Sequence, residues 1–250
     1  FSFDGKNIIY TSLASGDLEL WSMNSDGSDK QQLTNRMGYD GGAFYNYDGS
    51  KIVWRAYYPT TDKQITNYKV LLEENSIRPM ALQLWTMNSD GSGKQQLTKR
   101  VGYDGGAFYN HNGSKIVWRA YYPETDQEIN EYKFLLADNS IRPMALQLWT
   151  MNINGTNKKQ VTNNHAANFG PSFFPKKDRI IFSSNMHDEK GRDFDLYAID
   201  TNGENIERIT YFDGFDGFPM FSPDGKYLVF ASNRNQKKRG DTNIFVCEWK

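Results

Sequence analysis

The stretch GYDGGAFYN at Gly38–Asn46 returns letter for letter at Gly102–Asn110. Around it, residues 37–88 align without a gap on residues 101–152, and eleven of the 52 aligned pairs differ. Internal similarity at a fixed offset is the sequence signature of a repeat architecture. The chain therefore contains a duplicated structural unit, and its fold has to be one that is built from repeats.

Shorter segments of the same kind extend the repeat over the whole chain. Five segments align on one tight turn: FSFDGKNIIYTS, FYNYDGSKIVWRA, FYNHNGSKIVWRA, FFPKKDRIIFSS and FSPDGKYLVFAS. After each of them comes a third β-rich segment such as LELWSMN, and in the first four units an NSDGS-type turn and a short QQLT-type segment follow. Asp-Gly and Asn-Gly pairs supply the positive φ of tight hairpin turns. Each unit thus reads as a small antiparallel sheet of up to four strands.

One such sheet cannot cover its own apolar faces, so the units must stack around an axis. We predict an all-β chain, a β-propeller of four-stranded antiparallel blades with five repeat units. The expected unit boundaries are residues 1–36, 37–100, 101–164, 165–212 and 213–250, within a single domain of residues 1–250.

Two of the units carry long inserts with helical patterns. Thr61 with Gln64, and Thr125 with Glu128, have the spacing of a helix capping box. Apolar residues follow at helical spacing in each insert: Ile65, Tyr68, Leu71 and Leu72, then Ile129, Tyr132, Leu135 and Leu136. We expect a short helix in the inserts of units two and three, with its apolar stripe packed on its own blade or docking a partner.

Composition excludes several kinds of partner and cofactor. The net charge is −1 with mixed signs, which offers no basic stripe for nucleic acid and no polybasic membrane patch. No apolar run has the length of a membrane span. The single cysteine, Cys247, allows no internal disulfide and is expected to be buried as a small apolar residue. We expect no cofactor.

The repeat motifs also resemble a known family. FSPDGKYLVFASNR, MNSDGS and QQLT resemble the repeat of TolB-like β-propellers, relatives of the WD-repeat proteins. The insert EINEYKFLLADNSIRPMALQLW is similar to that of an exported bacterial subfamily with one such long blade, which is duplicated here. The resemblance implies a non-enzymatic module that binds protein or peptide at its channel mouth, in the periplasm or otherwise exported.

The expected site follows from strand direction. Because strands alternate, the links from strand two to strand three and from strand four to the next strand one share one edge, and every long link falls there. At one repeat-equivalent position on this edge stand Asp40, Asp104, Asn168 and Asp216, preceded by Tyr39, Tyr103, Ala167 and Phe215. We predict that the four polar residues contact a partner, together with Tyr39, Tyr103, Phe215, Arg78 and Arg142.

Two other roles for the four polar residues stay open at this point. Each could cap its own turn by accepting a hydrogen bond from the backbone N–H two residues on. Three carboxylates and an amide could also hold Ca²⁺.

The chain has no GxSxG, no HExxH and no phosphate-binding glycine loop. We therefore expect a binding module and not an enzyme. The alternative is a carboxylate-pair glycoside hydrolase or a sugar-binding five-bladed propeller. Such a hydrolase needs carboxylates in unlike environments, which repeat-equivalent aspartates do not favour.

The ends of the chain raise the question of closure. Phe1 aligns with Phe221, so the first innermost strand is nearly absent, and no fourth strand follows Ile244–Trp249. We favour a fragment of a larger propeller, with a five-bladed ring with a ragged seam or strand exchange between chains as the alternatives.

Overall fold

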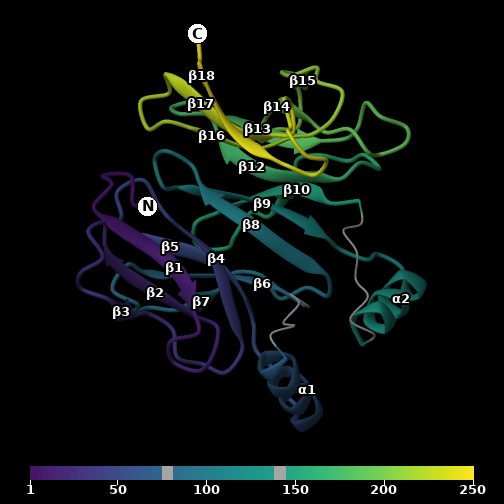
Figure 1. Ribbon diagram of the computed structural model, residues 1–250. Coiled ribbons are helices and arrows are strands. Elements are labelled where there is room, and N and C mark those ends of the chain that lie inside the picture. Colours follow the sequence, from purple (N-terminus) through teal and green to yellow (C-terminus); the bar gives the residue numbers. More distant parts are fainter. Residues whose placement is uncertain (75–80, 138–144) are drawn as a thin grey trace. The chain divides into compact units, whose positions relative to one another are not determined.

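The computed structural model describes residues 1–74, 81–137 and 145–250. Within them, it confirms the all-β propeller class: strands form five antiparallel sheets, three of four strands and two of three strands, and two short helices accompany them (Figure 1). The chain divides into two compact units, residues 1–107 with 122–142 and residues 108–121 with 143–250. The assignment of residues 1–250 to a single domain stays a prediction.

Hairpins build the two sheets of the first compact unit. The first sheet has the order β1-β2-β3 and the second β4-β5-β6-β7. Their strands are β1 (Asn7–Ser12), β2 (Glu19–Asn24), β3 (Gln31–Gln32), β4 (Tyr39–Tyr45), β5 (Lys51–Tyr57), β6 (Gln83–Asn88) and β7 (Gln95–Gln96).

The duplicated unit forms the third sheet, and two more sheets follow. Their orders are β11-β10-β9-β8, β12-β13-β14-β15 and β16-β17-β18. The strands are β8 (Tyr103–Tyr109), β9 (Lys115–Tyr121), β10 (Gln147–Asn152), β11 (Lys159–Gln160), β12 (Asn168–Phe173), β13 (Arg179–Ser184), β14 (Asp195–Asp200), β15 (Glu207–Arg208), β16 (Asp216–Phe221), β17 (Tyr227–Ser232) and β18 (Asn243–Glu248).

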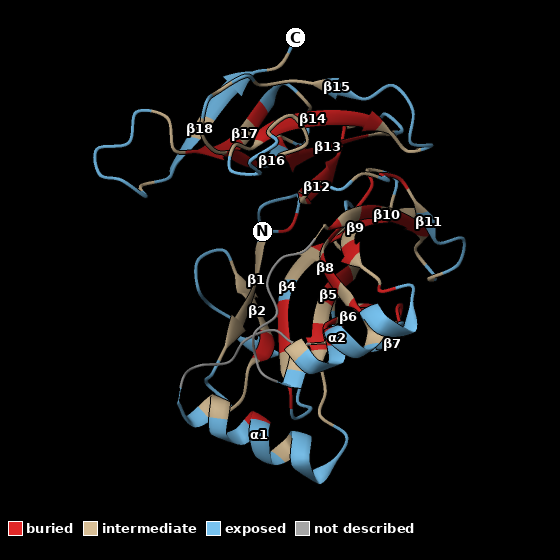
Figure 2. Cartoon of the chain, turned by 90° about the vertical axis from the view of Figure 1, so that its right-hand side faces the viewer, coloured by how far each residue is buried: buried red, intermediate tan, exposed pale blue. Residues whose placement is uncertain are grey.

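Apolar side chains between neighbouring sheets hold each unit together. In the first unit, Leu20, Ile52, Trp54 and Met87 are fully buried in one cluster with Leu33, Tyr45 and Ala56. In the second unit, one cluster includes Val117, Phe173 and Phe182, and another includes Phe174, Leu196 and Phe230. Each such side chain contributes roughly 1.5–3 kcal/mol by burial. Figure 2 shows the buried residues concentrated on the strands.

The innermost strands share a β-bulge that re-aims their first residues. Pairing with the second strand shifts register between Gly41 and Phe44 in β4, and the equivalent shifts occur in β12 and β16. The residue that creates the bulge has positive φ: +60° at Gly42, +58° at Gly170 and +55° at Phe218. Bulges often lie next to functional sites because they redirect side chains.

Both expected helices are present at the expected places. They are α1 (Asp62–Glu73) and α2 (Asp126–Ala137). The Gln64 backbone N–H donates to Thr61 Oγ1 at 3.3 Å and Gln64 Oε1 accepts from the Thr61 N–H at 3.2 Å, which completes the capping box. Thr125 and Glu128 repeat this arrangement in α2. The capping prediction is confirmed in both copies.

A tyrosine in the apolar stripe anchors α1. The Tyr68 side chain is buried, and its hydroxyl lies 2.5 Å from both Asp17 Oδ1 and the Gly38 carbonyl oxygen. Asp17 Oδ2 also accepts from the Gly38 N–H at 3.0 Å. Burial and the Asp17 carboxylate hold the pKa of Tyr68 well above its ordinary value, so the hydroxyl remains a donor. The stripe thus packs not only on its own blade but also on the preceding unit through Asp17.

One expectation about the core is wrong. Cys247 is exposed and not buried, because β18 pairs only with β17 among the described residues and most of its side chains remain accessible. Within the described part of the chain, neither helix is long and apolar enough to cross a membrane.

Candidate functional site

The long links fall on one edge of the sheets, as strand direction predicts. On that edge α1 lies in the link from β5 to β6, and α2 in the link from β9 to β10. The links from β13 to β14 and from β17 to β18, residues 185–194 and 233–242, leave the corresponding end of their own sheets. The opposite edge receives short turns such as residues 46–50 and 222–226. We call the first the long-link edge.

The four repeat-equivalent polar residues begin the innermost strands at this edge, and all four are buried. Asp40, Asp104, Asn168 and Asp216 each have 0% exposure. None of the four side chains is therefore exposed at a polar mouth. Their side-chain hydrogen bonds go mainly to other strands and links, so their immediate role is structural, and direct partner contact by them stays a prediction.

The residue eighteen positions after each of the four supplies the matching chemistry. Tyr58 donates its hydroxyl to Asp40 at 2.6 Å, and Tyr122 donates to Asp104 at 2.5 Å. In the last sheet, Arg234 forms an ion pair with Asp216. The equivalent of these residues after Asn168 is Met186, which packs on the apolar core. An acceptor is thus paired with a donor, and the neutral amide with an apolar residue.

Each of the four buried polar residues has a second polar residue at a fixed distance before it in the chain, and the type of this second residue also differs between repeat units. It lies 21 residues before, at Glu19, Gln83, Gln147 and Asp195. Gln147 Oε1 lies 3.5 Å from the Asn168 amide nitrogen, so two amides meet there. Asp195 is buried but forms an ion pair with Arg208.

Glu19 and Asp40 form an acid pair that lacks such a cation. Glu19 is 2% exposed, and neither carboxyl group forms an ion pair among the described residues. Burial raises the pKa of Glu19 to about 7, against the hydrogen bond from Thr34, and the Asp40 charge adds to the rise. Burial also raises the pKa of Asp40, although Tyr58 and Trp54 donate to it. Among the described residues, Glu19 Oε2 and Asp40 Oδ2 are each buried without a hydrogen-bond partner, and a proton shared by the two carboxyl groups would satisfy both.

This pair predicts a pH dependence of stability. Because the pKa of Glu19 is raised from 4.5 to about 7 on folding, its stabilising contribution is complete below pH 4.5 and is lost as the pH rises through 7. The Glu19→Gln substitution copies Gln83. In the unchanged chain, we expect the free energy of unfolding to fall by about 1 to 3 kcal/mol between about pH 5 and about pH 8 because of Glu19, and the variant should lack this fall. Urea unfolding at both pH values measures it.

The duplicated unit provides the control for this prediction. Replacing Gln83 with glutamate places a carboxyl group beside Asp104 and should create a second pH-dependent loss in the same direction. If the Glu19→Gln variant loses stability between the two pH values as steeply as the unchanged chain, the acid pair does not share a proton.

The aromatic residues at this edge explain the double glycine of the repeated phrase. A Cβ on Gly41 would lie 2.4 Å from the Tyr39 hydroxyl oxygen, and one on Gly217 would lie 2.5 Å from the Phe215 ring. Each ring therefore covers the glycine two residues later. In the fourth unit the pattern is reversed, with Ala167 in place of the aromatic residue and Phe169 in place of the glycine. Tyr39, Tyr103 and Phe215 remain partly exposed.

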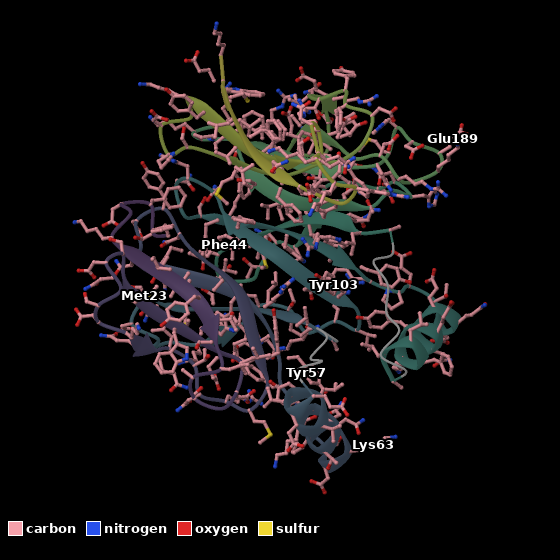
Figure 3. All side chains as sticks on the ribbon, in the orientation of Figure 1. Met23, Phe44, Tyr57, Lys63, Tyr103 and Glu189 are labelled. Atoms are coloured by element: carbon pink, nitrogen blue, oxygen red, sulfur yellow. The ribbon has the colours of Figure 1, made fainter. Side chains whose placement is uncertain are left out.

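Arg55 joins two of the predicted site residues. Its guanidinium donates to the Tyr39 hydroxyl at 3.3 Å and to the Tyr103 hydroxyl at 3.4 Å. Tyr39, Arg55 and Tyr103 thus form one partly exposed cluster, and Tyr103 is labelled in Figure 3. Sequence reasoning missed Arg55. The available signal was a cation inside the apolar strand segment IVWRAY.

Phe218 forms a second, aromatic cluster in the other compact unit. It is 56% exposed and has φ of +55°, where the equivalent residues are glycines. Its ring lies 5.1 Å from that of Phe169 and 6.1 Å from that of Phe215. A bulky residue held in the left-handed region is strained, and such strain is concentrated at functional sites.

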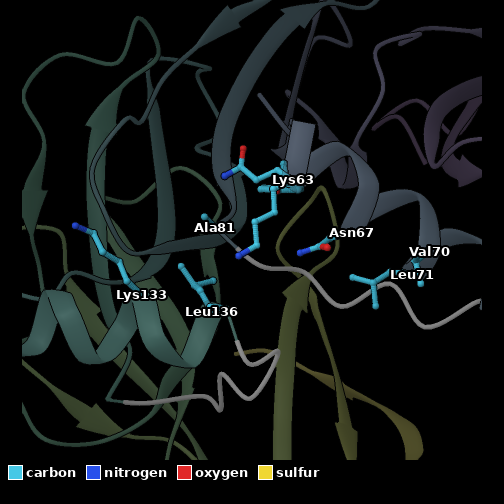
Figure 4. Close-up of a pocket in the computed structure, with 10 residues that line it drawn as sticks. Lys63, Asn67, Val70, Leu71, Ala81, Lys133 and Leu136 are labelled. Atoms are coloured by element: carbon cyan, nitrogen blue, oxygen red, sulfur yellow. The ribbon is translucent and has the colours of Figure 1, made fainter. Parts of the chain in front are cut away.

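A groove lies between the two helices. It has a volume of about 500 Å³ and is lined by Tyr57, Lys63, Gln64, Asn67, Val70, Leu71, Ala81, Lys133, Leu136 and Ala137. Figure 4 shows Lys63, Asn67 and Leu71 on α1, and Leu136 on α2 pointing toward Ala81, while the end of the Lys133 side chain points away from α1. We call it the α1–α2 groove. Pockets that bind ligands have volumes of about 300–1,000 Å³.

Two predicted site residues cannot be placed. Arg78 and Arg142 lie outside the described residues. Among the residues that are described, no group of three histidine, cysteine, aspartate or glutamate side chains is arranged to hold a metal ion. The calcium alternative therefore stays a prediction.

Comparison with known proteins identifies the repeat. Residues 136–249 match the TolB beta propeller domain family. This match, over slightly less than half of the chain, supports the resemblance to TolB-like propellers that the repeat motifs indicate. The chain is similar to a putative TolB from Agrobacterium tumefaciens, with 18% identity over 100% of this chain and 73% of that one and a TM-score of 0.62. TolB from Acinetobacter baumannii matches 99% of this propeller at 15% identity, with a TM-score of 0.67.

Enzymes also share the fold. An oligogalacturonate lyase in complex with manganese is 16% identical over 99% of this propeller, with a TM-score of 0.61. The propeller spans 61% of that lyase and 50% of the Acinetobacter protein. No curated protein sequence matches it. Likenesses at this identity establish the fold and leave the activity open.

Proposed function

We propose that this TolB-like propeller is a non-enzymatic module that binds a protein or peptide at the long-link edge. The observation that carries the proposal is the α1–α2 groove, formed on that edge by the two helix-bearing inserts. Partly exposed aromatic residues on the same edge, Tyr39, Tyr103 and Phe215, suit a binding surface because aromatic side chains are enriched at interfaces. By family resemblance, we also propose a periplasmic or otherwise exported location.

Burial of the acidic residues supports the non-enzymatic part. A glycoside hydrolase places two carboxyl groups on either side of a bound sugar. Asp40, Asp104 and Asp216 have no exposed surface and are hydrogen-bonded within the chain. In the proposal, these residues fix the ends of the innermost strands, while Tyr39, Tyr103 and Phe215 contact the partner.

Peptide display tests the binding surface. Random peptides are selected on the full chain, and their affinity is then measured for variants of each edge. We expect substitution of Tyr39 and Tyr103 by serine to weaken binding, and substitution of Asp26 and Asp90 in the short turns of the opposite edge to leave it unchanged. The reverse pattern would place the binding surface on the other edge.

An activity screen tests the other half of the proposal. Aryl glycosides, arabinan and proline-containing peptides should show no turnover above background. Turnover that disappears on replacing Asp104 with asparagine would show that the chain is an enzyme.

Phe218 offers a variant that separates binding from stability. Replacing Phe218 with glycine removes the left-handed strain of a bulky residue and copies Gly42 and Gly170. We expect the free energy of unfolding to stay unchanged or to rise by about 1 kcal/mol, while affinity for selected peptides falls. A loss of stability together with unchanged affinity would assign the residue to the core and not to the binding surface.

A further inference from the structure

The α1–α2 groove has a composition that departs from its own repeat. Five of the eleven positions at which the duplicated segments differ line it. On α1, the sequence has Lys63, Gln64, Asn67 and Val70 where α2 has Gln127, Glu128, Glu131 and Phe134, and on α2 it has Ala137 where α1 has Glu73. On α1, four of the five helix residues that line the groove differ from their equivalents, whereas on α2 one of three does.

At each of these five positions, the residue that lines the groove is either more positive than its equivalent in the other copy or has the same charge. Lys63 adds a positive charge relative to its equivalent, while Gln64, Asn67 and Ala137 each replace a carboxylate. Among the described residues, the lining contains two cations, Lys63 and Lys133, and no acidic residue. Lys63 also lies in the first turn of α1, where the helix dipole favours an anion and disfavours a lysine. The groove is therefore complementary to a negatively charged occupant.

Gln64 Oε1 is occupied by the Thr60 and Thr61 N–H groups, but three other polar side chains of the groove are available to bind such an occupant. Within the described residues, neither Lys63 nor Lys133 forms an ion pair, and the Asn67 side chain has no hydrogen bond. Neither lysine has an acidic residue three or four positions away on its own helix. Aliphatic side chains lie between these groups, with Val70 46% exposed and Leu71 and Leu136 partly buried. Figure 4 shows the lysines and the leucines together in the groove.

We propose that the α1–α2 groove binds a short acidic segment of a partner protein, in which carboxylate side chains flank an aliphatic one. The carboxylates pair with Lys63 and Lys133, and the aliphatic side chain covers Leu71 and Leu136. The Asn67 amide can both donate a hydrogen bond to a peptide backbone and accept one from it. An alkyl carboxylate has no backbone and cannot form this pair of hydrogen bonds. This inference rests on the proposed function and specifies its site and the class of partner.

The repeat provides the test variant. Lys63→Gln, Gln64→Glu and Asn67→Glu together copy the α2 sequence onto α1, and α2 shows that this sequence forms the same capped helix. The control variant makes the reverse change on α2, Gln127→Lys, Glu128→Gln and Glu131→Asn, at positions outside the groove. Circular dichroism confirms that both variants keep their helices.

Binding of fluorescein-labelled octapeptides to the full chain is measured by anisotropy. The probes are an octapeptide of glutamate and leucine, a lysine and leucine equivalent, and dodecanoate as competitor. We expect the acidic peptide to bind, the basic one not to bind, and the α1 variant to weaken the acidic peptide about tenfold or more while the α2 variant does not. Added salt should weaken the same interaction.

Three results would overturn the inference. They are no binding of the acidic peptide at about 1 mM, equal binding by the α1 variant, and binding of dodecanoate without the peptide. Display-selected peptides separate this inference from the proposed function. If they bind the long-link edge but are indifferent to the α1 variant, the proposed function stands and the groove assignment fails.

Discussion

Replacing Arg234 with methionine is expected to lower the free energy of unfolding by about 3 to 5 kcal/mol. The Arg234 guanidinium pairs with Asp216, whose side chain is completely buried, and it also donates to Ser232 Oγ at 2.9 Å. It lies over the rings of Phe212 and Phe230 as well. Without it, Asp216 keeps a buried charge that no other ion pair among the described residues compensates. Urea unfolding with linear extrapolation measures the loss.

The preceding unit supplies the control. Combining Arg234→Met with Asp216→Asn copies the neutral pair of Met186 and Asn168 and removes the buried charge. We expect it to recover a large part of the lost stability, although the Asn164 partner of Asn168 has Phe212 as its equivalent. A single variant that loses less than about 1 kcal/mol would show that the ion pair contributes no more than an exposed one.

The second large effect is expected at Trp54. Its side chain is fully buried in the core of the first compact unit, and its Nε1–H donates to Asp40 Oδ1 at 2.5 Å. Replacing it with alanine leaves a cavity and removes a donor from a buried carboxyl group, so we expect a loss of about 3 to 5 kcal/mol. The same unfolding measurement applies.

Phenylalanine at this position separates the two contributions. Trp54→Phe retains most of the apolar volume but not the N–H donor, so its expected cost is about 1 to 3 kcal/mol. If Trp54→Phe costs as much as Trp54→Ala, packing has little part in the effect. If it costs nothing, the hydrogen bond to Asp40 does not stabilise the fold.

Much of the fold was predictable because the chain repeats itself. Tight Asp-Gly and Asn-Gly turns locate the hairpins, and the duplicated segment separates the regular strands from the insert. The capping pairs Thr61 with Gln64 and Thr125 with Glu128 fix where the helices begin, since local hydrogen bonds between neighbours decide it. The exposure of Cys247 was not predictable, because it depends on what covers β18.

The site was harder to predict, for a different physical reason. Alignment places Asp40, Asp104, Asn168 and Asp216 at one position but does not say whether their side chains face solvent or another strand. The signal was eighteen residues further along the chain, where a tyrosine or arginine (Tyr58, Tyr122 or Arg234) follows each aspartate and Met186 follows Asn168. The α1–α2 groove requires two consecutive inserts to come together, and only the structure shows which helix faces form it.

Hydrogen exchange with a bound peptide tests the central claim most directly. Deuterium uptake of the full chain is compared with and without a display-selected peptide at saturating concentration. Binding at the long-link edge predicts protection of residues 57–71 and 121–137, which carry α1 and α2. Protection confined to the opposite edge, at the turns of residues 24–28, 88–92, 152–156 and 200–204, would contradict the account.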